Sequence, residues 1–197
     1  MIIKVSVILL AAGLSARMGE DKLLLKYKGK SFLQHSIDLL QKLPVYERII
    51  VTTDARQRHI VLPNTIKLCI NPNPEKGQST SIKIGVEAAT GTHYLFLAAD
   101  QPLLTKNDII PLLDAADSNP EKIIFPIIDS KPNSPTIFPG TFKEKLNKLC
   151  GDKGGRVIRD ANKDLWYTIE PETPENFTDI DTVAQYISLK GNIKHDK

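Results

Sequence analysis

The sequence predicts an α/β protein with a three-layer α/β/α sandwich around a mostly parallel sheet. Short apolar runs of strand length alternate along the chain with segments of helical period, which is the order of right-handed βαβ units. The first runs are almost continuously apolar, as in strands that are covered on both faces. With 197 residues, of which 41% are hydrophobic, the chain is long enough for one buried core and short for two. We therefore expect a single domain over residues 1–190, followed by a polar tail over residues 191–197.

Seven apolar runs are the predicted strands. The first four are nearly continuous in apolar character and cover residues 5–10, 49–51, 66–70 and 94–98. Three further candidates cover residues 123–127, 136–138 and 166–169. Because continuous apolar character is typical of strands buried on both faces, we expect the first four to lie parallel inside the sheet.

Three segments between these strands have a helical spacing of apolar residues, and each begins near a side chain that can cap a helix. Ser31 can cap the first segment. Ser79 or Thr80 can open the second, and Asn107 can cap the third. The apolar residues that recur at helical spacing and should face the sheet are Leu33, Ile37, Leu40, Ile82, Val86, Ala89, Ile110, Leu113 and Ala116.

Charge and cysteine content exclude several classes of protein. The formal net charge of +3 is too small to indicate a nucleic-acid or membrane-surface partner. No run reaches the roughly 18 apolar residues that a membrane span needs. Cys69 and Cys150 lie far apart and have no neighbours at metal-ligand spacing, which argues against a disulfide framework and a structural zinc site. We therefore expect reduced thiols in a cytoplasmic protein, without a nucleic-acid or membrane partner.

The residues after the first predicted strand favour phosphate binding. In an open α/β sheet, ligands bind beyond the carboxyl ends of the strands. Ala11, Ala12 and Gly13 let the backbone approach a ligand, and successive N–H groups can cradle phosphate oxygens. Arg17 and Lys22 add positive charge for a polyphosphate. On composition alone, a glycine-bearing turn with two solvated cations explains the loop equally well. The glycine spacings of the P-loop and of the dinucleotide fingerprint are missing, which disfavours kinases, GTPases and NAD enzymes.

Asp100 is the candidate ligand for a divalent metal. It follows the apolar run 94–98, so its carboxylate should emerge at the carboxyl end of a strand, and Pro102 prevents the strand from continuing. Mg²⁺ is usually held by one or two carboxylates together with substrate phosphates. The alternative is an aspartate that caps the helix expected near Thr105. Beside a phosphate-binding loop, the metal role is the better interpretation.

Five segments in order carry a family resemblance. They are residues 10–22 (LAAGLSARMGEDK), 77–82 (GQSTSI), 98–102 (AADQP), 151–156 (GDKGGR) and 179–182 (DIDT). The first segment is highly specific, and the later ones gain weight from their order. The chain thereby resembles the MobA-like NTP transferases, and especially the molybdenum cofactor cytidylyltransferases among them.

The resemblance implies a Rossmann-like nucleotidyltransferase fold, the fold of the nucleotide-diphospho-sugar transferases. It implies an enzyme that moves CMP from CTP onto the terminal phosphate of molybdopterin and releases pyrophosphate. It also implies that Asp100 and Asp181 hold Mg²⁺ or Mn²⁺, while Lys22 and Arg17 stabilise charge on the phosphates. For Asp181, the alternative is the N-cap of a helix over residues 182–189.

The resemblance further assigns residues to the two substrates. The nucleotide-binding residues would be Leu10, Ala11, Ala12, Gly13, Arg17, Lys22, Gly77, Gln78 and Ser79. The acceptor-binding residues would be Asn133, Pro135, Gly154, Gly155 and Arg156. Where the family usually has a glycine before the proline, this chain has Asn133, which can also adopt a left-handed backbone. A helix cap at Ser79 and a plain turn at residues 154–156 are the bland alternatives.

Three other functions stay open at this point. Ala12 stands where the guanylyltransferase branch usually has a second glycine, which favours CTP but does not exclude GTP. A non-catalytic protein could bind the cofactor and deliver it to a molybdenum hydroxylase, although such a carrier would need neither Lys22 nor Asp100. A cytidylyltransferase for an isoprenoid or sugar phosphate would share the fold. A molybdenum hydroxylase is the candidate protein partner.

Overall fold

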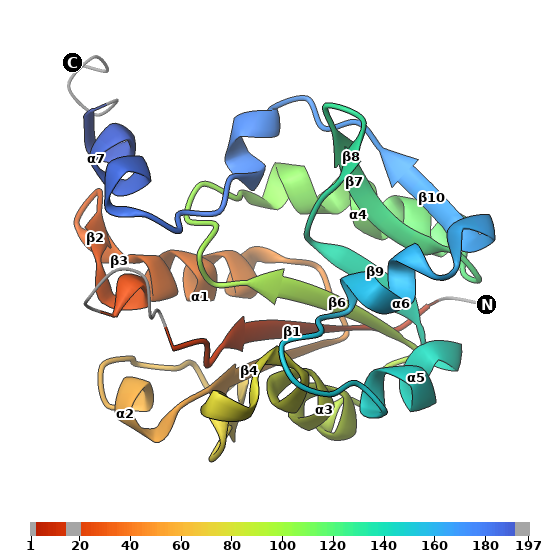
Figure 1. Ribbon diagram of the computed structural model, residues 1–197, viewed down its shortest axis with the longest axis horizontal. Helices are drawn as coiled ribbons and strands as arrows, with labels where there is room; N and C mark the ends of the chain where they lie inside the picture. Colours follow the sequence, from red (N-terminus) through yellow and green to blue (C-terminus); the bar gives the residue numbers. More distant parts are fainter. Residues whose placement is uncertain (1–2, 15–20, 192–197) are drawn as a thin grey trace.

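The computed structural model describes residues 3–14 and 21–191, which form a twisted central sheet covered by helices on both faces (Figure 1). Within these residues, eight strands make the sheet, in the order β10-β7-β9-β6-β1-β4-β5, with β8 paired to β7. Their bounds are β1 (Val5–Ala11), β4 (Glu47–Thr52), β5 (Lys67–Ile70), β6 (His93–Ala98), β7 (Ile123–Ile128), β8 (Lys131–Pro132), β9 (Thr136–Pro139) and β10 (Trp166–Ile169). A separate hairpin consists of β2 (Lys26–Tyr27) and β3 (Lys30–Ser31). All seven predicted strands are present.

The sheet is parallel around its first strand and mixed farther out. β1 pairs in parallel with β4 and β6, and β4 pairs in parallel with β5. β9 runs antiparallel between β6 and β7, while β10 is again parallel to β7. The carboxyl ends of β1, β4 and β6 therefore meet at one edge, where ligands bind in folds of this type.

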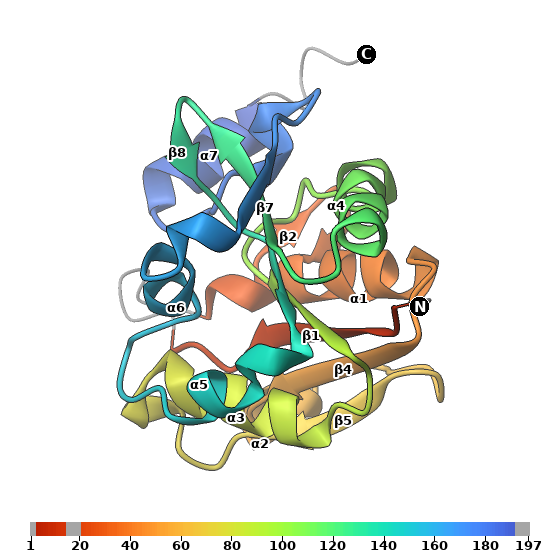
Figure 2. The ribbon, with the colours of Figure 1, turned by 90° about the vertical axis from the view of Figure 1, so that its right-hand side faces the viewer.

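Helices cover both faces of the sheet, as the α/β/α prediction requires (Figure 2). On one face, α1 (Phe32–Lys42) and α4 (Lys106–Ser118) share a hydrophobic cluster with Val7 and Leu9 of β1. On the other face, α3 (Gln78–Ala88) and α5 (Lys143–Asn147) pack with Ile8. The remaining helices are α2 (Asp54–Gln57), α6 (Arg156–Asp160) and α7 (Val183–Gly191), together with the 3₁₀ turns η1 (Lys22–Leu24), η2 (Pro74–Lys76), η3 (Gly140–Phe142), η4 (Lys163–Leu165) and η5 (Pro174–Phe177). Successive side chains of β1 thus pack alternately against the helices on the two faces of the sheet.

One of the three predicted helix caps is confirmed. Ser31 is the N-cap of α1 and accepts a hydrogen bond from Gln34 N at 3.1 Å. The other two predictions are wrong by two or three residues. Gly77, not Ser79 or Thr80, precedes α3, because its φ of +93° turns the chain into the helix. Thr105, not Asn107, caps α4 through a capping box with Asp108.

Two predictions about burial are also corrected. The inward face of α4 carries Ile109 and Leu112, whereas Ile110 and Leu113 are only partly buried. The predicted strand over residues 66–70 is not covered on both faces, because β5 is the outermost strand on its side and leaves Leu68 exposed. An apolar run does not distinguish an edge strand from an inner one.

Arg17 and the tail from residue 192 are outside the described residues. The cysteines Cys69 and Cys150 are both free thiols. Within the described ranges, no helix is both long and apolar enough to cross a membrane.

Candidate active site

Two adjoining pockets open at the carboxyl ends of β1 and β6. Leu10 and Ala98 at these strand ends, together with Gln78 of α3, line both pockets. The loop pocket is lined by the chain after β1 and by neighbouring segments, and it includes Ala12, Gly13, Leu14, Lys22, Gly77, Ser81, Asp100 and Asp152. The arginine pocket includes Asn133, Thr136, Gly154, Gly155, Arg156, Arg159 and Asp179. Two ligands could therefore lie end to end along this edge of the sheet.

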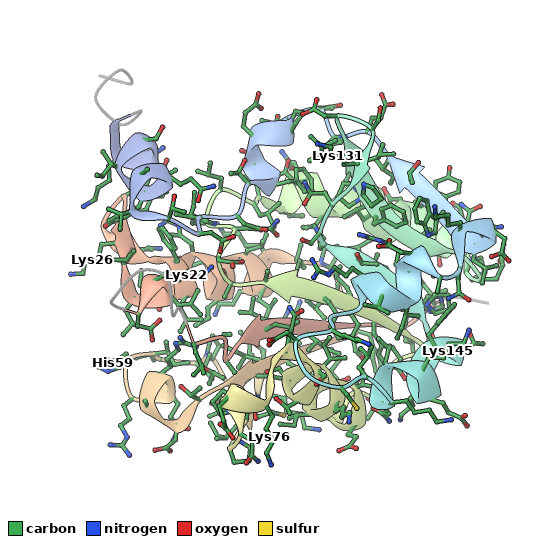
Figure 3. The ribbon with its side chains drawn as sticks, viewed as in Figure 1. Lys22, Lys26, His59, Lys76, Lys131 and Lys145 are labelled. Carbon is green, nitrogen blue, oxygen red and sulfur yellow. The ribbon has the colours of Figure 1, made fainter. Side chains whose placement is uncertain are left out.

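The side chains of Lys22, Asp100 and Asp181 meet at the carboxyl edge of the sheet. Lys22 Nζ lies 2.7 Å from Asp100 Oδ2 and 2.6 Å from Asp181 Oδ1. The Lys22 side chain is only 14% exposed, and Figure 3 shows it inside the outline of the molecule, whereas Lys26 and Lys145 extend from the rim. The sequence predicted that Lys22 would act on phosphates. In the structure its ammonium group bridges the two predicted metal-binding carboxylates.

The backbone explains why Asp181 reaches this place. Ile180 is buried, and its N–H donates to the carbonyl oxygen of Asp100 at 3.0 Å. The residues on either side of Ile180 are therefore held next to the end of β6. Thr182, not Asp181, accepts a hydrogen bond from Gln185 N at 3.2 Å in the first turn of α7. The side chain of Asp181 does not cap the helix but pairs with Lys22.

The charges of this cluster shift two pKa values. Burial lowers the pKa of Lys22, but the Asp100 and Asp181 carboxylates outweigh this effect and raise it above the ordinary lysine value. Burial, with the nearby charges of Asp100 and Asp181, raises the pKa of Asp179 to about 7. Asp179 was not predicted as a site residue, although its place two residues before Asp181, on the other side of the buried Ile180, could have indicated it.

The donor set fits a divalent metal that is completed by a substrate. Asp100 Oδ1 is buried and finds no hydrogen-bond partner among the described residues. Asp100 and Asp181 are already held around one cation, the Lys22 ammonium group. The described residues contain no group of three or more His, Cys, Asp or Glu side chains that could enclose a metal by themselves. Two carboxylates plus phosphate oxygens are the usual ligands of Mg²⁺.

Among the described residues, the predicted nucleotide-binding residues gather in the loop pocket, except for the fully buried Ala11 and one polar residue. Leu10, Ala12, Gly13, Gly77 and Gln78 line it. A Cβ at Gly13 would meet no atom of the described residues within 4 Å.

Ser79 is the predicted polar residue that does not line the loop pocket. Its side chain is buried and does not line the loop pocket, whereas Ser81 does. Ser79 N donates to Gly151 O at 3.1 Å, which ties the start of α3 to the 151–156 segment. A Cβ on Gly77 would overlap this same turn, since it would lie 2.5 Å from Gly151 O. Ser79 therefore stabilises the surroundings of the loop pocket without lining it.

The predicted acceptor-binding residues line the arginine pocket, apart from Pro135. Asn133 is not left-handed; the left-handed non-glycine residues of this hairpin are Asp129 and Ser130, where β7 turns into β8. The predicted replacement of glycine by a left-handed asparagine is therefore wrong, because the turn is made earlier in the chain.

Two glycines of the arginine pocket have side chains packed closely against them. A Cβ on Gly154 would overlap the Gln78 side chain, and one on Gly155 would lie 3.0 Å from the Phe138 ring. Arg159, which the sequence analysis missed, is buried above the Phe125 ring and donates to Asn133 O at 3.3 Å. The 151–156 segment and α6 thus form one wall of this pocket.

Comparison with known proteins defines the class. The model of the family described as MobA-like NTP transferase domain matches residues 7–165. A probable molybdenum cofactor guanylyltransferase of Rhodopirellula baltica is 31% identical over 82% of this chain and 77% of its own length. The molybdenum cofactor cytidylyltransferase of Escherichia coli is 28% identical over 93% of this chain and 94% of its own.

Solved structures agree on the fold. The crystal structure of Rv0371c from Mycobacterium tuberculosis superimposes with a TM-score of 0.81 at 19% identity, covering 97% of this chain and all of the other. A complex of that protein with manganese gives a TM-score of 0.76 at 18% identity, covering 95% and 98%. A nucleotidyl transferase from Methanothermobacter gives 0.79 at 18% identity, covering 98% and 99%. The protein is therefore a nucleotidyltransferase with the fold of the nucleotide-diphospho-sugar transferases. It belongs to the MobA-like NTP transferase family.

Proposed function

We propose that this enzyme transfers CMP from CTP to the terminal phosphate of molybdopterin and releases pyrophosphate. The observation that carries the proposal is the meeting of Lys22, Asp100 and Asp181 at the loop pocket, which Lys22 and Asp100 line and which adjoins the arginine pocket. A nucleotidyl transfer needs two substrates end to end with neutralised phosphates between them. Relatives named as molybdenum cofactor cytidylyl- and guanylyltransferases support the choice of acceptor.

The chemistry requires positioning and charge neutralisation, without a covalent enzyme intermediate. An oxygen of the acceptor phosphate attacks the α-phosphorus of CTP. The bond from the α-phosphorus to the bridging oxygen breaks, and pyrophosphate leaves with the electron pair. Asp100 and Asp181 would hold Mg²⁺ or Mn²⁺, which neutralises phosphate charge when bound. Lys22 would move from these carboxylates to the phosphates, where Arg17 adds a second positive charge.

The loop pocket would hold CTP and the arginine pocket the acceptor. Ala12, Gly13 and Leu14 place backbone groups beside the loop pocket, as a triphosphate requires. Arg156 and Arg159 give the arginine pocket positive charge for an anionic acceptor. The product would serve a molybdenum hydroxylase.

GTP is the second candidate nucleotide. The 31% identical relative is a probable guanylyltransferase, which favours GTP, whereas Ala12 in place of a second glycine favours CTP. A pocket that hydrogen-bonds one base rejects another because its buried polar groups would be left unpaired. We expect CTP to exceed GTP in kcat/KM by at least about tenfold.

The test is pyrophosphate release with each of the four NTPs, with and without molybdopterin, in Mg²⁺ or Mn²⁺. Release with CTP that depends on molybdopterin supports the proposal. Equal use of CTP and GTP contradicts the cytidine choice alone. Release that depends on an isoprenoid or sugar phosphate instead contradicts the acceptor. A protein that binds molybdopterin but releases no pyrophosphate with any NTP is a carrier.

A further inference from the structure

We infer that Arg56 is a positioning residue. It contacts both ends of the proposed phosphate-binding loop, at Ala11 and Gly13 on one side and at Asp21 on the other. Arg56 belongs to α2, which follows β4, the neighbour of β1 in the sheet. Its side chain is buried, with 5% of the residue exposed. Such a buried guanidinium must be matched by hydrogen-bond acceptors, because an uncompensated buried charge is strongly destabilising.

The acceptors of Arg56 lie on both sides of the loop. Its Nη1 donates to Ala11 O at 2.8 Å and its Nη2 to Gly13 O at 2.5 Å, on the side where the chain leaves β1. Its Nε donates to Asp21 Oδ2 at 2.5 Å, on the side where the chain enters η1. One rigid, planar group therefore fixes both ends of the loop.

These bonds orient the backbone of the loop. The peptide bonds after Ala11 and Gly13 are trans, so each N–H points away from the carbonyl of the same peptide. With both carbonyls turned toward Arg56, the N–H groups of Ala12 and Leu14 point the opposite way. Ala12, Gly13 and Leu14 line the loop pocket. Arg56 thus presents two N–H donors to that pocket, as the phosphates of a nucleotide require.

The same contact also supports Lys22. Asp21 Oδ1 accepts from Leu23 N at 3.1 Å and so caps η1, whose first residue is Lys22. The Arg56–Asp21 pair fixes this cap, and the cap fixes the base of the lysine that reaches Asp100. The inference rests on the proposed function only in taking a nucleoside triphosphate as the ligand of the loop pocket.

The experiment compares CTP and cytidine binding by calorimetric titration in Mg²⁺ for the parent and for Arg56→Met. We expect CTP binding to weaken by at least about tenfold, which is 1.4 kcal/mol, and cytidine binding to change by less than about twofold. A merely structural role would weaken both ligands alike. The matched control is Arg58→Met, since Arg58 is exposed, directly follows α2 and, within the described residues, pairs with Asp54.

Two further variants keep the test decisive if Arg56→Met does not fold. Arg56→Lys keeps the charge but cannot span the three acceptors, and Asp21→Asn keeps the η1 cap without the charge. Both should weaken CTP binding with little effect on cytidine. CTP binding equal to the parent's in these variants would overturn the inference, whether or not the parent transfers CMP to molybdopterin. A parent that binds CTP but transfers nothing contradicts the proposed function alone, and a parent that binds no NTP contradicts both.

Discussion

Lys22 supplies the positive charge that neutralises the carboxylates of the site. Its ammonium group lies within 2.7 Å of two carboxylates that, in its absence, would repel each other. A divalent metal and this ammonium group compete for the same oxygens. Arrival of a triphosphate would draw Lys22 away and leave the carboxylates to the metal, which couples metal binding to nucleotide binding.

Replacing Lys22 therefore separates metal binding from catalysis. We expect Lys22→Ala to bind Mn²⁺ several-fold more tightly than the parent in the absence of nucleotide, as measured by electron paramagnetic resonance. The same variant should lose activity by about 100-fold, the usual cost of removing a charge-stabilising group. Lys26→Ala, which changes an exposed lysine nearby, is the control. Unchanged Mn²⁺ affinity in Lys22→Ala would contradict the competition.

Asp179 makes stability depend on pH. Its pKa is raised to about 7 in the folded protein, against about 4 in an unfolded chain. Between these values the unfolded state has lost the proton that the folded state keeps, so this group lowers stability as pH rises. Asp179→Asn removes the effect. Without divalent metal, the variant should melt at least about 2 °C above the parent at pH 8, the shift of roughly 1 kcal/mol in a chain of this size.

The difference should shrink near pH 4, where the carboxyl group is protonated in most folded molecules. Thermal melts followed by circular dichroism at both pH values measure it. An equal melting temperature at pH 8, or a larger difference at pH 4, would contradict the shifted pKa.

The helix α3 shows how one glycine sets the position of a whole segment. Gly77 has a φ of +93°, and the Cβ of any other residue would overlap the turn at Gly151. The 77–82 and 151–156 segments are thereby held together, although they are far apart in the sequence. The helical period of apolar residues predicted α3, but it could not place the first residue, because capping groups are as common inside this segment as before it.

Gly77→Ala should destabilise the fold by at least about 1 kcal/mol, the cost of a left-handed backbone in a residue with a Cβ, to which the overlap adds. Gly13→Ala is the matched variant, since Gly13 has no positive φ and its Cβ would meet no neighbour within 4 Å in the part of the chain that the structure describes. We expect it to melt like the parent but to bind CTP more weakly, because the added methyl group enters the space of the ligand. Chemical denaturation and CTP titration of both variants decide between packing and ligand approach.

The fold as a whole could be predicted because apolar runs and helical periods alternate clearly along the chain. All seven predicted strands are present in the sheet, within a few residues of their predicted bounds. Asp100 and Asp181 both lie against Lys22 Nζ; the strand end indicated Asp100, whereas Asp181 was implied only by the family resemblance. The bridging position of Lys22, the half-buried position of Asp179 and the contacts of Arg56 with Ala11, Gly13 and Asp21 could not be predicted, because each depends on which loops meet in space.

The proposed function places nucleotidyl transfer at the carboxylates around Lys22. The most direct measurement is pyrophosphate release from CTP and molybdopterin by Asp100→Ala, beside its thermal melt. The variant should fold, since it removes a buried oxygen without a partner and leaves Lys22 paired with Asp181. We expect activity at least about 100-fold below the parent's. Near-parental turnover by a correctly folded Asp100→Ala protein would contradict the claim.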